Sequence, residues 1–125
     1  MISMELTIQQ VAARTGLSVH TLRYYEKIGL MEPIPRAVNG HRSYHGKDIE
    51  WIILLTRLRS TGMPIAEMQR FADMMRLGDA GIGQRRALLE EHEQKLQAQV
   101  KELQDTLSVL QGKITYYRSW EAGQI

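Results

Sequence analysis

The sequence has no cysteine, one phenylalanine and three prolines among its 125 residues. Without cysteine the chain cannot form disulfides, thiolate nucleophiles, cysteine-ligated zinc sites or iron–sulfur clusters. The longest uninterrupted apolar run, residues 51–55, is far shorter than the roughly 20 residues that span a membrane. The N-terminal residues also lack the basic and apolar regions of a signal peptide. We therefore expect a cytoplasmic protein with no membrane partner.

Charge of either sign is moderate, because charged residues make up 24% of the chain and the net charge is +2. This balance is ordinary for a globular protein and excludes a disordered polyelectrolyte. Ten basic residues accompany seven acidic ones up to Leu77, whereas six accompany seven from Gly78 onward. The modestly basic first part is compatible with an anionic partner, although it does not require one.

Two short helices are predicted near the N-terminus. Thr7 begins the first, with Gln10 at the spacing of a capping box, and apolar residues follow at helical spacing until Gly16. Ser18 caps the second helix, which ends at Gly29. Two helices joined by a short turn that contains glycine form a helix-turn-helix.

The segment between residues 30 and 44 holds Pro33, Pro35 and the pair Asn39-Gly40. Asn-Gly between strand-compatible residues is the strongest short signal for a hairpin, so residues 34–44 are predicted to form a two-stranded ribbon with its turn at this pair. Two more helices follow, at about 47–60 and 64–77, with Pro64 in the first turn of the later one. Their expected inward positions are Ile49, Ile52, Ile53 and Leu55–Leu58 in the first, and Ile65, Met68, Phe71, Ala72 and Met75 in the second.

Three glycines in residues 78–83 predict a flexible joint, since no strand precedes them and no Lys-Ser/Thr follows, as a phosphate loop would need. Beyond the joint, a single helix is predicted over residues 84–120. It carries a heptad repeat of apolar residues, interrupted only by Glu93. The predicted dimerisation seam consists of Leu89, Leu96, Val100, Leu103, Leu107, Leu110, Ile114 and Tyr117.

Such a seam is too long to be buried by its own small domain. Each aliphatic seam side chain contributes about 2 kcal/mol when fully covered, so an exposed seam would not persist alone. We therefore predict a homodimer through this helix, and the alternative is that the helix folds back on the N-terminal domain. The flanking positions are mostly uncharged, so these residues leave the relative orientation of the two helices open.

Motifs for catalysis are missing. The sequence has no Gly-x-Ser-x-Gly and no His-Glu-x-x-His, and Glu90, Glu91 and Glu93 are expected to be a solvated helix face. His41 and His45 lack a third nearby ligand for a metal ion. The sequence therefore predicts no enzyme, no metal site and no cofactor.

A helix-turn-helix presents the N-terminal residues of its second helix to the major groove of DNA. Short polar side chains stand there, followed by cationic and aromatic ones, and a second basic and aromatic group lies in the ribbon. Tyr25 shares the helix face of Leu22, so the alternative to DNA contact for this residue is a position in the core. The predicted DNA-binding residues are Ser18, Val19, His20, Thr21, Arg23, Tyr24 and Lys27 in the helix, and Arg36, Asn39, His41, Arg42 and Tyr44 in the ribbon.

The motifs Leu22-Arg23-Tyr24-Tyr25-Glu26 and Gly40-His41-Arg42-Ser43-Tyr44, in this order after Thr7–Ala12, resemble those of the MerR family. The resemblance covers nearly the whole chain. It implies a mainly α winged helix-turn-helix followed by a long dimerisation helix, paired as an antiparallel coiled coil. Family members bind an imperfect palindrome in an overlong promoter spacer and distort it so that RNA polymerase holoenzyme engages both promoter elements. By this analogy Arg23, Tyr24, Arg42 and Tyr44 contact the DNA backbone, and residues 60–63 form a second wing.

The resulting domain prediction is a DNA-binding domain at 4–77, a joint at 78–83, a coiled coil at 84–120 and a tail at 121–125. Two departures from the family concern sensing. Metal-sensing members use cysteines, and this sequence has none. Multidrug-sensing members carry a large C-terminal ligand domain, whereas this 125-residue sequence ends at Ile125. A third is Pro64, where relatives commonly have a Ser or Thr cap. We therefore expect either a small apolar organic effector at the end of the rod or no effector, and a packed coil end is an equal alternative. The candidate effector residues are Met74, Met75, Tyr116, Tyr117 and Trp120. The other function class left open is a coiled-coil adaptor whose winged domain docks on protein.

Overall fold

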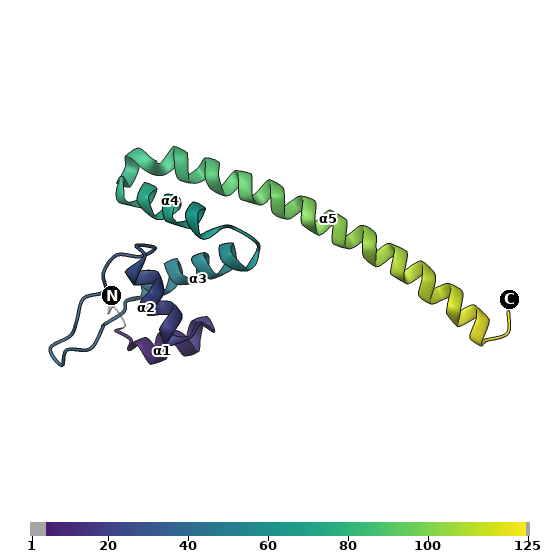
Figure 1. Cartoon of the computed structure of the whole chain (residues 1–125), viewed down its shortest axis with the longest axis horizontal. Helices are drawn as coiled ribbons and strands as arrows, with labels where there is room; N and C mark the ends of the chain where they lie inside the picture. The colour runs from purple at the N-terminus through teal and green to yellow at the C-terminus, as the bar shows by residue number, and fades with distance from the viewer. Residues whose placement is uncertain (1–4, 125) are drawn as a thin grey trace. The chain divides into compact units, whose positions relative to one another are not determined.

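The computed structural model describes residues 5–124, so Met4 and Ile125 of the predicted boundaries lie outside it. Its helices are α1 (Ile8–Thr15), α2 (Val19–Lys27), α3 (Gly46–Ser60), α4 (Ile65–Arg76), the short 3-10 helix η1 (Gly78–Gly81) and α5 (Ile82–Glu121) (Figure 1). The mainly helical fold confirms the predicted class. The chain divides into two compact units, and the boundary lies between Arg85 and Arg86.

Caps at α1 and α2 follow the sequence closely. The backbone N–H of Gln10 donates to Thr7 Oγ1 at 3.2 Å, and the backbone N–H of Thr7 donates to Gln10 Oε1 at 2.8 Å. Gly16 ends α1 in the left-handed region, with φ of 77°. Ser18 Oγ then accepts the N–H of Thr21 at 3.0 Å. These contacts confirm the predicted helix-turn-helix, because they satisfy donors that a helix start leaves unpaired.

The core of the N-terminal unit combines apolar residues from its helices with the segment after α2. The largest fully buried side chains include Leu22, Leu30, Ile52, Leu55 and Met68.

Trp51 and Phe71 connect α3 to α4 within that core. Their rings stack with centroids 5.3 Å apart, and the Trp51 indole N–H donates to the Leu30 carbonyl at 2.7 Å. The predicted inward positions Ile53 and Met75 are wrong, since their side chains are 43% and 41% exposed. In α3 the buried residues 52, 55 and 58 share one helical face, and residue 53 is turned about 100° away from residue 52.

The wing, residues 34–44, is a loop closed by a turn, not the predicted two-stranded ribbon. One isolated bridge joins Arg36 to Arg42, and another joins Tyr44 to Leu6. The N–H of Gly40 donates to the Ala37 carbonyl at 2.9 Å, and the N–H of Ala37 donates to the His41 carbonyl at 2.8 Å. The chain therefore reverses over Ala37–Gly40.

The turn includes the predicted pair Asn39-Gly40, but it is not a two-residue loop. A two-residue Asn-Gly turn needs positive φ at both central residues, and within residues 5–124 only glycines have positive φ. Gly40, with φ of 83°, instead takes the single left-handed position that closes a three-residue loop.

Residues 78–83, predicted as a flexible joint, form η1 and the first residues of α5. Gly81 is buried against the backbone of Met74, where an added Cβ would collide with the Met74 carbonyl oxygen. The Arg85 guanidinium donates to the Gly78 carbonyl at 2.9 Å and to Met75 Sδ at 2.8 Å. Glycine at position 81 therefore serves close packing in an ordered turn.

The second unit consists of α5 beyond Arg85 and the residues that follow the helix. Ion pairs one turn apart join Arg86 to Glu90, Lys95 to Glu91 and Lys101 to Asp105. No helix within residues 5–124 combines the length and apolarity that crossing a membrane requires.

Candidate nucleic-acid interface

The N-terminal turn of α2 presents short polar side chains to solvent. Ser18 and His20 are exposed, and Val19 and Thr21 are half-buried. The hydroxyl of Ser18 donates to Thr21 Oγ1 at 2.9 Å, so these two hydroxyls hold each other in place. His20 carries the longest side chain of the four. This is the surface that a helix-turn-helix offers to base edges.

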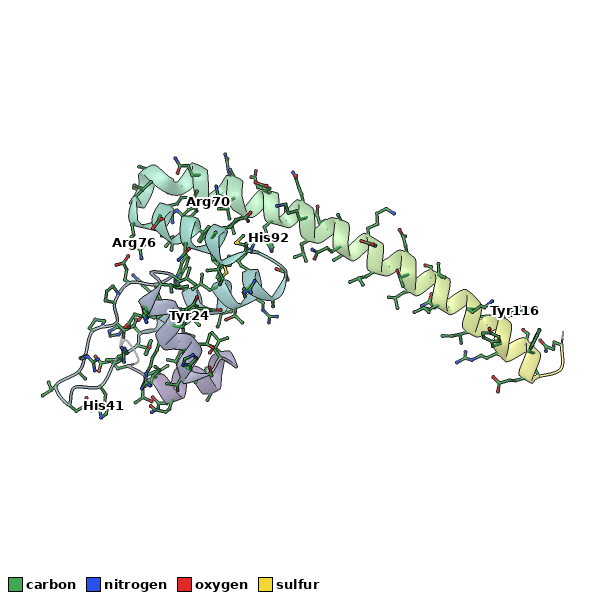
Figure 2. All side chains as sticks on the ribbon, in the orientation of Figure 1. Tyr24, His41, Arg70, Arg76, His92 and Tyr116 are labelled. Carbon is green, nitrogen blue, oxygen red and sulfur yellow. The ribbon has the colours of Figure 1, made fainter. Side chains whose placement is uncertain are left out.

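Further along α2, the cationic and aromatic residues separate into exposed and buried groups. Arg23 and Lys27 are exposed, and so is Tyr24, at 46%. Tyr24 is labelled on α2 in Figure 2. Tyr25 is buried, which agrees with the core alternative for this residue. The exposed residues of the helix thus form one face on which a polyanion can lie.

Tyr44 is fully buried, so the prediction that its side chain lines an exposed ribbon was wrong. Its backbone N–H and carbonyl pair with Leu6, at 2.9 Å and 2.8 Å, which carries the ring inward. The hydroxyl has no hydrogen-bond partner among the described residues. Burial, together with the negative charge of Glu26, raises the pKa of the Tyr44 phenol above its ordinary value of 10.0.

The wing contributes two arginines with different surroundings. Arg42 is half-buried, and its Nε donates to both carboxylate oxygens of Glu26, at 3.1 Å and 3.2 Å. Arg36 is exposed, and its Nη1 donates to the Gly40 carbonyl at 2.7 Å. Asn39 Oδ1 accepts the N–H of His41 at 3.0 Å, so the Asn39 side chain stabilises the turn. His41 is exposed at the wing (Figure 2).

A cavity of about 430 Å³ brings the helix-turn-helix and the wing together. Residues at the start of α1 and cationic residues of α2 and the wing line it. The lining residues are Thr7, Ile8, Gln9, Arg23, Arg36, His41 and Arg42.

The chemistry of this cavity suits an anion. The first N–H groups of a helix have no partner within the helix, and the helix dipole makes that end positive. Three arginines line the same space, and their guanidinium groups are the planar, charged donors that phosphates accept. Sequence reasoning missed Thr7, Ile8 and Gln9 because their capping pattern signals only where a helix starts.

No cluster of three or more metal-ligating side chains occurs in the described part of the chain. His41 and His45 are not part of such a group.

Two protein-family models match this chain, one over the helix-turn-helix and the wing and the other over the helices that follow. Residues 7–44 match the model of the MerR family regulatory protein, and residues 49–113 match the MerR DNA-binding model. Together these matches cover well over half of the chain. The chain belongs to the MerR family.

Among MerR relatives, an HTH-type transcriptional regulator of Haemophilus influenzae is 34% identical over 119 residues, which cover 95% of this chain and 88% of that protein. The crystal structure of HiNmlR, a MerR family regulator lacking the sensor domain, bound to promoter DNA, has a TM-score of 0.84 at 34% identity. The match covers 95% of this chain and 94% of that one. A MerR family regulator from Listeria monocytogenes also gives a TM-score of 0.84, at 31% identity over 91% of this chain and 86% of that one.

This chain is thus a MerR-family DNA-binding transcription regulator, as predicted, and the family is not one of enzymes. The position predicted for a second MerR wing, residues 60–63, consists of the last residue of α3 and the turn that leads to α4. Gly62 has φ of 100° there, and Met63 is buried. Pro64 precedes α4 as its N-cap without a side-chain cap bond.

The predicted seam residues of the MerR dimerisation helix all lie on α5. Leu89 and Leu96 are half-buried in this single chain. The others, from Val100 to Tyr117, are 46% to 65% exposed.

The candidate effector residues fall into two groups. Met74 and Met75 lie at the end of α4, the first half-buried and the second exposed. Tyr116, Tyr117 and Trp120 cluster near the end of α5, where the ring centroid of Tyr116 lies 5.7 Å from that of each of the other two. Lys113 Nζ lies 5.1 Å from the Tyr116 ring centroid.

Proposed function

We propose that this regulator binds a palindromic promoter element as a homodimer and controls transcription by distorting the promoter spacer. The observation that carries the proposal is the cationic cavity lined by residues of α2, the wing and the start of α1, together with the exposed Ser18 and His20 at the start of α2. Donors suited to phosphate and side chains suited to reading bases, both contributed by α2 and its surroundings, support the proposal. HiNmlR, similar over almost the entire chain, is described as bound to promoter DNA.

The homodimer forms through the α5 seam. Val100, Leu103, Leu107, Leu110 and Ile114 are 46% to 65% exposed in the single chain, although each would contribute about 2 kcal/mol when fully buried. A second copy of the same helix offers the same spacing of apolar residues and covers them. Two copies related by a two-fold axis present two α2 helices, which matches the symmetry of a palindrome.

Control of transcription at a promoter implies a further partner and a place of action. RNA polymerase holoenzyme engages the promoter that the dimer distorts, and the site of action is the cytoplasmic nucleoid.

Substitutions on α2 separate phosphate contact from base reading. Arg23→Ala should weaken binding to a duplex from the region upstream of the gene by about 1–3 kcal/mol, and by the same amount on an altered duplex. His20→Ala should instead change which bases are preferred. Arg118→Ala, which removes an exposed cation of α5, is the charge-matched control. Fluorescence anisotropy measures the affinities, and unchanged affinity for Arg23→Ala would show that α2 does not face DNA.

An effector, where one acts, is a small apolar or aromatic organic molecule bound where Tyr116, Tyr117 and Trp120 of one copy meet Met74 and Met75 of the other. These 125 residues carry no thiol, so alkylation or disulfide formation cannot switch them. The effector must bind the promoter-distorting state more tightly than the resting state. In vitro transcription with iodoacetamide and divalent metals tests this, and a strong response to either reagent would exclude it.

A further inference from the structure

Glu26 is an acidic residue in the last turn of α2, beside a surface built from cations. The motif Leu22-Arg23-Tyr24-Tyr25-Glu26 contains it, yet neither the helix-turn-helix nor the core accounts for a carboxylate there. A negative charge near bound DNA would repel the phosphates, so its presence calls for a compensating role.

Glu26 connects α2 to both ends of the wing. Its two carboxylate oxygens accept Arg42 Nε at 3.1 Å and 3.2 Å, from the end of the wing. The N–H of Ile34, at the start of the wing, also points to Glu26 Oε2, at 3.5 Å. The side chains of Glu26 and Arg42 are 15% and 24% exposed, so water screens this ion pair less than a surface pair.

The way Arg42 is held leaves most of its donors available. A guanidinium has five N–H donors, and Glu26 takes only the one on Nε. Neither Nη1 nor Nη2 of Arg42 takes part in a hydrogen bond within the described residues. Arg42 also lines the cavity that Arg23 and Arg36 line.

We propose that Glu26 is a positioning residue for DNA binding: it holds the Arg42 guanidinium so that Nη1 and Nη2 face a backbone phosphate at the cavity. The inference rests on the proposed function. A free arginine samples many rotamers and loses that freedom on binding, whereas the carboxylate has already fixed this one before DNA arrives.

This role predicts the opposite sign from simple electrostatics. If Glu26 only added negative charge, Glu26→Gln would strengthen DNA binding and Glu26→Asp would leave it unchanged. As a positioning residue, both substitutions weaken binding, because Gln pairs less strongly with a guanidinium and Asp is one methylene too short to reach it.

A double-mutant cycle on the full chain tests the proposal, with the wild type, Glu26→Gln, Arg42→Ala and the double variant bound to the upstream duplex. We expect Glu26→Gln to bind about 3–10-fold more weakly than the wild type, and to add less than twofold in the Arg42→Ala background. Glu32→Gln removes an acid that is 70% exposed and pairs with Arg76, so it is the matched control and should bind as the wild type does.

Tighter or unchanged binding by Glu26→Gln overturns the proposal, as does an effect that persists undiminished without Arg42. If Glu26→Gln does not fold at the assay temperature, the same cycle with Glu26→Asp decides, and it must give weaker binding that depends on Arg42. Failure of the wild type to bind the upstream duplex would contradict the proposed function instead, so the two failures are distinguishable.

Discussion

Neighbouring residues of the interface differ in what their side chains do. Arg23 stands exposed on α2, Arg36 pairs with a wing carbonyl, and Arg42 is held by Glu26, yet all three line one cavity. Tyr24 is exposed while the adjacent Tyr25 is in the core. Chemical type alone therefore does not define the interface, and burial decides which side chains can reach a phosphate.

Tyr44→Phe should leave stability unchanged at neutral pH or raise it by about 1 kcal/mol, because the hydroxyl is buried without a partner among the described residues. The raised pKa means that the folded state holds the phenol proton more tightly than the unfolded state. The protonated phenol therefore makes its full contribution to stability below pH 10, and the wild type loses this contribution as pH rises through the pKa of the folded state. Tyr44→Phe has no phenol to titrate, so it should lose less stability than the wild type over that pH range.

Urea unfolding at about pH 7 and about pH 10.5 measures this difference. Tyr24→Phe, which removes a hydroxyl from an exposed ring, is the control. A loss of more than about 1 kcal/mol in Tyr44→Phe at neutral pH would show that the hydroxyl has a partner.

Sequence could predict the exposed residues of α2, because helical periodicity separates Arg23 and Tyr24 from Leu22 and Tyr25. It could not predict Tyr44, whose burial depends on pairing with Leu6, 38 positions away. It also could not show that Glu26 meets Arg42, since that contact joins a helix to a loop across 16 positions. Local patterns carry information about neighbours along an element and little about pairs brought together by the fold.

At the scale of elements, helices were predicted to within a few residues, and irregular segments were not. Caps such as Thr7 and Ser18 act through hydrogen bonds within three residues, so their sequence signal is complete. In the wing, the Asn39-Gly40 pair is compatible with two loop types, and the hydrogen bonds of Ala37 with Gly40 and His41 select one. At residues 78–83, the glycines were interpreted as a sign of flexibility, whereas Gly81 packs closely against the backbone of Met74.

Gly81→Ala and Gly83→Ala distinguish these two uses of glycine. A Cβ at position 81 would collide with the backbone of Met74, so the first variant should lose about 1–3 kcal/mol of stability. At Gly83 the space is open and the residue is helical, so alanine should be neutral or stabilise by up to about 1 kcal/mol. Thermal unfolding measures both. Equal effects of the two substitutions would mean that residues 78–83 are loosely packed after all.

At the scale of the whole molecule, the proposed function depends on α5, because in the proposed dimer each winged unit contacts one half-site of the palindrome. Leu107→Glu would place a charge in the apolar seam and should abolish dimerisation, since desolvating an unpaired charge costs more than the seam leucine contributes. Operator binding should fall with it. Analytical ultracentrifugation and anisotropy check the two together, with Lys101→Glu outside the seam as control. A monomeric variant that binds the full palindrome normally would refute the dimer.

The salt dependence of DNA binding tests the central claim most directly, that the cationic cavity and α2 hold a promoter duplex. Neutralised phosphates release counterions, so the logarithm of affinity falls linearly with the logarithm of salt concentration. For a dimer with about 6–10 phosphate contacts, we expect a slope of roughly −5 to −9 on the upstream duplex and much weaker binding to a scrambled duplex. A flat salt response, or equal affinity for both duplexes, would contradict the account and favour a winged domain that docks on protein.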